Sequence, residues 1–178
     1  MLVYGLGALV LGTCVLFAAG PWLSPEREVG FAPTANARAH ADGTFTITVD
    51  VSEAGREVEL DLLRGTIAPL GQPGHLRLQR HLITSRRTAL DLGAVLLSQA
   101  EIAPERLSSS GTNNSPNPLA HWYQYSYWTH RLRSLDHTYA IGIDDERIAY
   151  AKILSYYCNT GTAGCLTLRY RLATITAQ

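Results

Sequence analysis

The chain has 178 residues with 15 basic and 15 acidic side chains, and its formal net charge is zero. This length holds one domain and a short additional segment, but not two full domains. The balanced charge removes the usual reason to expect a nucleic-acid partner, because nothing would neutralise a run of phosphates.

The first 23 residues, MLVYGLGALVLGTCVLFAAGPWL, contain no charged side chain. At about 1.5 Å per residue a helix of this length crosses the ~30 Å hydrocarbon core of a bilayer. The alternative is a secretory signal peptide, but no basic residue precedes the apolar run. Cleavage after Gly20 would leave Pro21 next to the cut, and cleavage after Ala19 would leave bulky Phe17 three residues before it. We therefore predict a retained transmembrane helix over residues 1–23.

One face of this expected helix carries small residues. Gly5, Ala8 and Gly12 are spaced by three and four positions, and small residues let a second transmembrane helix approach closely. Trp22 stands where an interfacial aromatic residue is expected. Residues 26–28 carry two acidic side chains and one basic side chain, so they show no excess of positive charge that would orient the chain.

Residues 24–42 are rich in proline, alanine and charge without periodicity, which indicates an extended linker. Residues 43–178 then form the predicted domain. In its first half, TFTITVDV and EVELDLL alternate with period two, as strands do, and HLRLQRHLI alternates before a slip. TALDLGAVLL fits a strand or a short helix, and residues 104–120 form a polar loop.

The last third of the chain contains four further strand candidates, HWYQYSYW, TYAIGI, RIAYAKILSYY and CLTLRYRLATI. Short turns at 133–137, 144–146 and 159–164 connect them. Consecutive strands at this spacing favour an all-β antiparallel sandwich or flattened barrel.

Two cysteines stand at the mouth of the last turn. Cys158 and Cys165 are seven residues apart across a loop of small residues, so two paired strands could bring them to bridging distance. The alternative is a pair of reduced core cysteines. A disulfide closing so short a ring would contribute about 2–3 kcal/mol. It would also place the domain in an oxidising compartment, which for a single-pass bacterial inner-membrane protein is the periplasm.

The sequence shows no recognisable catalytic or metal-binding motif. Its six histidines form neither HExxH nor HxH, and no serine lies in GxSxG. The acidic stretch 144–146 is typical of a charged turn, so we expect no metal site. No acid–base pair converges in the pattern, and we expect a protein that is not an enzyme.

The stretch Trp122–Trp128 is unusually aromatic. As a strand it would place its three tyrosines on one face and Trp122 and Trp128 on the other. One face would be core, and the other could form a partner surface with Trp122 and Trp128. The alternative is that the aromatic side chains belong to the core alone.

Three segments, HWYQYSYWTHRL, HTYAIGIDDERIAYAKILSYYC and GCLTLRYRL, resemble the C-terminal half of the HmuY-like family of bacterial all-β proteins. The family pattern has a WYxY strand and a YAK-x-x-[IL]-x-SYY strand. The matching positions are Trp122, Tyr123, Tyr125, Tyr139, Tyr150, Ala151, Lys152, Ser155, Tyr156 and Tyr157. The resemblance spans about residues 74–172 and implies a secreted or lipid-anchored protein.

The resemblance also implies haem as a ligand, held in that family by histidine or methionine pairs. Met1 is the only methionine, so the ligands here would be histidines, with His121, His130 and His137 as candidates and His75 and His81 as further choices. Leu76 stands where the family has tryptophan, and an uncleaved helix replaces the lipoprotein signal.

Two functions follow from the sequence. The first is a non-catalytic accessory subunit that is anchored in the membrane and docks on a larger complex, such as a respiratory or photosynthetic electron-transfer assembly. It needs no cofactor, and its partners would be membrane-protein subunits and the lipid bilayer. The second is an HmuY-like haem-binding module with two histidine ligands.

Overall fold

Antiparallel strands make up nearly all the regular structure in the computed structural model, which describes residues 28–102 and 117–175. Two short 3-10 helices, η2 (Leu97–Gln99) and η3 (Pro118–His121), interrupt them. The strands are β1 (Arg38–Ala39), β2 (Phe45–Asp50), β3 (Val58–Asp61), β4 (Thr66–Ile67), β5 (Leu76–Gln79), β6 (Leu82–Ser85), β7 (Ala89–Asp91), β8 (Tyr123–Ser126), β9 (Arg131–Ser134), β10 (Thr138–Gly142), β11 (Arg147–Tyr157) and β12 (Ala163–Thr174).

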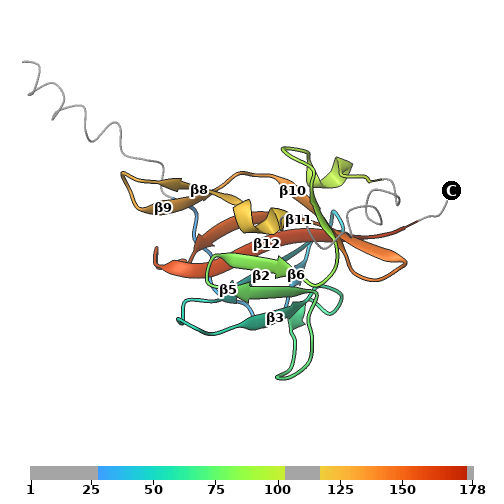
Figure 1. The fold of residues 1–178 in the computed structure, drawn as a ribbon, viewed down its shortest axis with the longest axis horizontal. Helices are drawn as coiled ribbons and strands as arrows, with labels where there is room; N and C mark the ends of the chain where they lie inside the picture. Colours follow the sequence, from blue (N-terminus) through green and yellow to red (C-terminus); the bar gives the residue numbers. More distant parts are fainter. Residues whose placement is uncertain (1–27, 103–116, 176–178) are drawn as a thin grey trace, which may run out of the picture.

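The strands form two larger sheets and one separate hairpin. The larger sheet has the order β1-β2-β12-β11-β10-β7, the smaller one β4-β3-β5-β6, and β8 pairs only with β9. The smaller sheet lies below β11 and β12 in Figure 1, and the main hydrophobic cluster draws side chains from both sheets. This arrangement confirms the all-β antiparallel prediction, in its sandwich form.

The period-two patterns identify the core-facing side chains correctly. Ile47 and Val49 of β2 are buried, as are Leu76 and Leu78 of β5. The slip in the third pattern is a tight turn between β5 and β6, where Arg80 has a φ of 52°. The predicted 147–157 strand is β11 to the residue.

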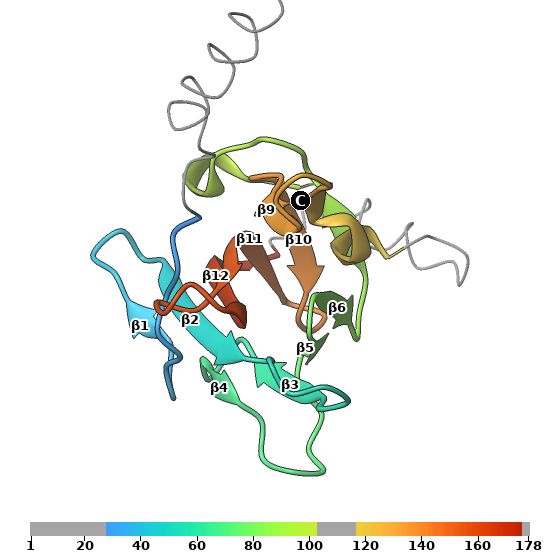
Figure 2. The same cartoon turned by 90° about the vertical axis from the view of Figure 1, so that its left-hand side faces the viewer.

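The centre of the larger sheet is buried on both faces. Ala149 and Ala151 of β11 belong to the main core, whereas Ile148 and Tyr150 belong to a second cluster on the opposite face. Residues 92–102, which follow β7, cover that second face, and Arg171 holds them by donating to the backbone carbonyls of Leu97 and Ala100. Figure 2 shows β11 and the segment that covers it from the side.

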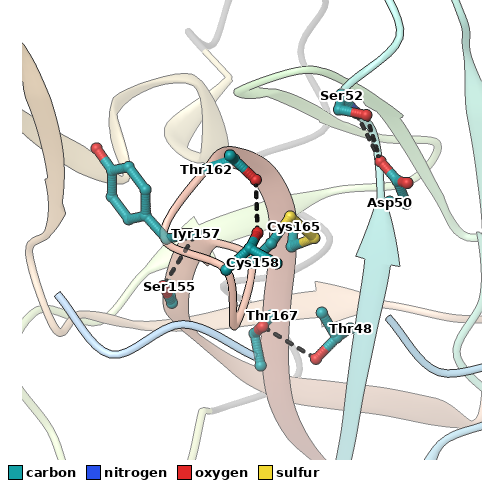
Figure 3. The surroundings of a disulfide bond; sticks show 10 residues. Thr48, Asp50, Ser52, Ser155, Tyr157, Cys158, Thr162, Cys165 and Thr167 are labelled. Atoms are coloured by element: carbon teal, nitrogen blue, oxygen red, sulfur yellow. Dashed lines mark hydrogen bonds between the residues drawn. A yellow bond between two sulfur atoms is a disulfide. The ribbon is translucent and has the colours of Figure 1, made fainter. Parts of the chain in front are cut away.

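The disulfide between Cys158 and Cys165 is present, as the spacing predicted, with Cα atoms 4.8 Å apart. It closes the hairpin between β11 and β12 (Figure 3), where the Cys158 amide also donates to the Thr162 carbonyl at 2.8 Å. Gly164 lies just after this turn and has a φ of 117°. A Cβ at this position would come within 2.5 Å of the Ser52 Cβ. Glycine at this position therefore lets the hairpin lie against the end of β2.

Residues 28–42, the described part of the expected linker, run along the domain instead of away from it. Phe31 donates to the Tyr157 carbonyl at 2.9 Å and accepts from the Asn159 amide, and Thr34 donates to the Thr48 carbonyl. β1 then pairs with β2. The segment is extended, but its backbone hydrogen bonds make it part of the sheet, which composition alone does not reveal.

The expected membrane helix and its small face, Gly5, Ala8 and Gly12, lie outside the described residues. Within residues 28–102 and 117–175, no helix has the length and apolar character needed to cross a membrane. The 88–97 stretch, which fitted a strand or a short helix, contains β7 and the first residue of η2. The strand β9, at the edge of the expected 133–137 turn, was not predicted.

Candidate functional site

The β8–β9 hairpin stands apart from both larger sheets. Its strands pair through four residues each, from Tyr123 opposite Ser134 to Ser126 opposite Arg131. In Figure 1 it lies at the upper left, and its connecting turn points away from β10 and β11. An isolated two-stranded hairpin is only marginally stable in water, so contacts with the body must hold it.

Those contacts come from β9 and end on β11. The Arg131 guanidinium lies 4.2 Å from the centre of the Tyr157 ring, and the Leu132 amide donates to the Tyr157 hydroxyl at 2.8 Å. The Ser134 hydroxyl donates to the Ile153 carbonyl. β9 therefore holds the hairpin on the large sheet and leaves the end of β8 and the turn facing solvent.

The outer end of the hairpin carries four side chains that we name the aromatic tip: Tyr125, Tyr127, Trp128 and His130. Trp128 is 97% exposed and Tyr127 is 83% exposed. The rings of Tyr125 and Tyr127 meet edge to face at 5.1 Å. Large aromatic side chains that are so fully exposed together are typical of an interaction surface.

Within the aromatic tip, Tyr125 and His130 form a hydrogen-bonded pair. The phenol oxygen lies 2.6 Å from the imidazole Nδ1. His130 has a left-handed φ of 53°, which fits its place at the end of the tight turn. In the tautomer with its proton on Nε2, His130 accepts the phenol proton in this bond. A phenol oxygen whose proton is accepted by such a partner can act as a ligand to ferric iron.

Trp122 does not lie on a partner surface, which corrects the expectation from the sequence. It is only 1% exposed, and its indole Nε1 donates to the His81 carbonyl at 2.8 Å. The reason is local: Pro118 opens the 3-10 turn η3, the side chain of Asn117 caps it, and β8 begins only at Tyr123. The alternation of a strand therefore never reaches Trp122, and of the two predicted surface tryptophans only Trp128 is exposed.

The three histidines proposed as haem ligands lie on or beside different elements of the fold. His121 ends η3 at the base of the hairpin, and His130 lies at its opposite end. The Nδ1 of His137 lies 2.9 Å from the Asp91 carboxylate. Among the described residues, no group of three or more histidine, cysteine or acidic side chains is placed to hold a metal ion. A haem-ligating histidine pair from this set stays a prediction from the sequence.

The two further histidines are structural. His75 Nδ1 accepts from the Leu62 amide at 3.1 Å, although the Asp61 carboxylate also lies 3.3 Å away. Burial lowers the pKa of His75, which agrees with the neutral ring that the backbone bond requires. The His81 ring meets Tyr123 edge to face at 5.5 Å, and burial lowers its pKa too.

Sequence reasoning missed the Tyr125–His130 pair. It treated the aromatic run as one long strand, so that His130 followed the strand instead of folding back on it. The available signal was the separation of five positions between Tyr125 and His130. A four-residue turn between two strands brings residues at this separation close together.

Comparison with known proteins finds similarity only at the level of structure. No family model matches the chain, and no curated protein matches it. A lipoprotein candidate from Bacteroides fragilis aligns with a TM-score of 0.55 and 16% identity, over 82% of this chain and 97% of the other. An HmuY-like haem-binding candidate from Bacteroides vulgatus gives 0.54 and 12%, over 80% and 97%.

A third solved structure, apo PinO from Porphyromonas gingivitis, aligns with a TM-score of 0.59 and 10% identity, over 75% of this chain and 98% of the other. The TM-scores show a shared fold, and identities this low support no closer relationship. The chain therefore has an HmuY-like fold, in agreement with the resemblance in its last third.

Proposed function

We propose that this protein is a non-catalytic, membrane-tethered haem-binding module that works on the periplasmic side of the bacterial inner membrane. The observation that carries the proposal is the Tyr125–His130 pair, exposed on an HmuY-like fold. One solved neighbour, which is described as an HmuY-like haem-binding protein, supports the ligand class. The disulfide supports an oxidising compartment.

The donor set of the aromatic tip fits haem. A tyrosine oxygen is an established protein ligand of haem iron, which supplies a Lewis-acidic centre when bound. Tyr125 would provide that oxygen, and His130 Nδ1 would hold the phenol proton. The ring of Tyr127, 5.1 Å from that of Tyr125, would offer an apolar face to the porphyrin. This replaces the histidine pair that the sequence suggested.

Haem titration of the purified full chain in mild detergent tests the proposal. We expect a Soret band that saturates, and at least a tenfold loss of affinity in Tyr125→Phe, which removes only the donor oxygen. Tyr127→Phe is the matched control, because it removes the same atom from a neighbouring ring, and its affinity should stay close to that of the wild type. No saturable band would refute haem binding, and equal affinity in both variants would refute the ligand assignment.

The tether is proposed from the uncharged residues 1–23, which precede the described chain. N-terminal sequencing of membrane-extracted protein should begin at Met1 or Leu2. A mature terminus between Ala19 and Leu23 would instead show a cleaved signal peptide.

A second candidate function is the accessory subunit of a membrane complex. The exposure of Trp128 favours it, because a ring that is 97% exposed is a ready contact for another molecule. If the helix packs on a neighbour through Gly12, then Gly12→Leu should release the protein from its complex during mild extraction. Leu11→Ile, which adds no volume, should not. Equal retention of both variants would remove the helix contact from the proposal.

A further inference from the structure

We infer that the aromatic tip rests in the headgroup region of the bilayer, beside the point where the chain leaves the membrane, with Trp128 as its main contact. This rests on the tether proposed above, but not on haem binding. It assigns a lipid surface, and not a protein, as the partner of the exposed ring.

The first argument is position. Glu28, where the described chain begins, lies 4.0 Å from Arg133 of β9, with its carboxylate facing the guanidinium. Only residues 24–27 separate Glu28 from Leu23, the end of the expected membrane helix. A chain extends at most about 3.6 Å per residue, so five steps keep Glu28 within about 18 Å of that end.

The second argument is the geometry of the hairpin. Arg133 of β9 pairs with Gln124 of β8, and on each strand the turn is three residues away. At about 3.3 Å per residue the turn lies about 10 Å beyond this pair. The aromatic tip thus lies about 10 Å from the residue that faces Glu28, which keeps it within reach of the expected membrane surface.

The third argument is chemistry. Tryptophan and tyrosine are the side chains that concentrate at the membrane interface, where an apolar ring and a polar atom are both accommodated. Residues 121–134 contain no acidic side chain, and Arg133, which is largely exposed, lies behind the tip. An aromatic end whose own strands carry no acidic side chain suits contact with phosphate headgroups.

Depth-dependent quenching in vesicles tests the inference on the full chain. The protein carries three tryptophans, and Trp122 is buried. In a Trp22→Phe variant, emission that lipids can quench therefore comes from Trp128. The variant is reconstituted in phosphatidylcholine vesicles that contain lipids brominated at shallow acyl positions. We expect the loss of most of the Trp128 emission.

The matched control moves the reporter. Leu70 is fully exposed in the β4–β5 loop, which lies on the opposite side of the molecule from β8 and β9 in Figures 1 and 2. With Trp22→Phe and Trp128→Phe as background, Leu70→Trp should keep its emission. Both reporter positions are exposed, so circular dichroism should show an unchanged fold.

The outcomes separate the inference from the tether. If the protein floats with vesicles and Trp128 is not quenched, the tether stands and the inference is wrong. If the protein does not float, both fail. Equal quenching at both reporter positions would show non-specific adsorption and refute a specific contact. Protection of Trp128 from acrylamide in native membranes but not in protein-free vesicles would assign a protein partner and overturn the inference.

Discussion

Replacing each of two tryptophans by phenylalanine separates the core from the surface of this domain. Trp122→Phe removes the indole donor to the His81 carbonyl, a 2.8 Å bond in a side chain that is only 1% exposed. Leaving a partly buried carbonyl unpaired costs about 1–3 kcal/mol, and the cavity left by the smaller ring adds about 1 kcal/mol. We therefore expect a loss of about 2–4 kcal/mol in the free energy of unfolding.

For a domain of this size, 1 kcal/mol corresponds to a shift of about 2–4 °C in Tm. A loss of about 3 kcal/mol thus predicts a Tm lower by about 6–12 °C, measured by circular dichroism on the full chain in mild detergent. Trp128→Phe, at a position that is 97% exposed, should change stability by less than about 0.5 kcal/mol. Equal shifts in the two variants would refute the assignment of Trp122 to the core and of Trp128 to the surface.

Three further predictions follow from the fold. Removing the Cys158–Cys165 bridge by a double alanine substitution should cost about 2–3 kcal/mol in urea unfolding, and thiol labelling of denatured, unreduced wild type should find one free cysteine; three labelled thiols would contradict the bridge. Gly74→Ala should destabilise the domain more than Gly71→Ala, because its Cβ would meet the β3 backbone at 2.6 Å whereas that of Gly71 meets nothing; equal losses of Tm would show that β3 yields. Burial lowers the pKa of His75, so the unfolded chain gains a proton near pH 6.5 while the folded chain does not. Stability should therefore fall as the pH drops below about 6.5, and His75→Asn should flatten this decline in Tm measured from pH 7 to 5; an unchanged slope would exclude His75 as its source.

The sequence by itself determined most of the strands and the disulfide. Alternation with period two locates side chains on the faces of a strand without any knowledge of the partner strands, which is why β2, β5 and β11 were predicted well. The bridge between Cys158 and Cys165 also depends on local geometry, because seven residues with a turn of small side chains bring the ends of one hairpin together.

Only the tertiary structure decided which side chains are buried and which distant segments are in contact. The 3-10 turn before β8 moved Trp122 into the core and left Trp128 outside, because the depth of a ring depends on the sheet packed against it. Residues 28–42 became part of the sheet through hydrogen bonds to distant segments, which composition does not encode. The Tyr125–His130 pair exists because β9 folds back on β8, a pairing between residues that a single-strand reading keeps apart.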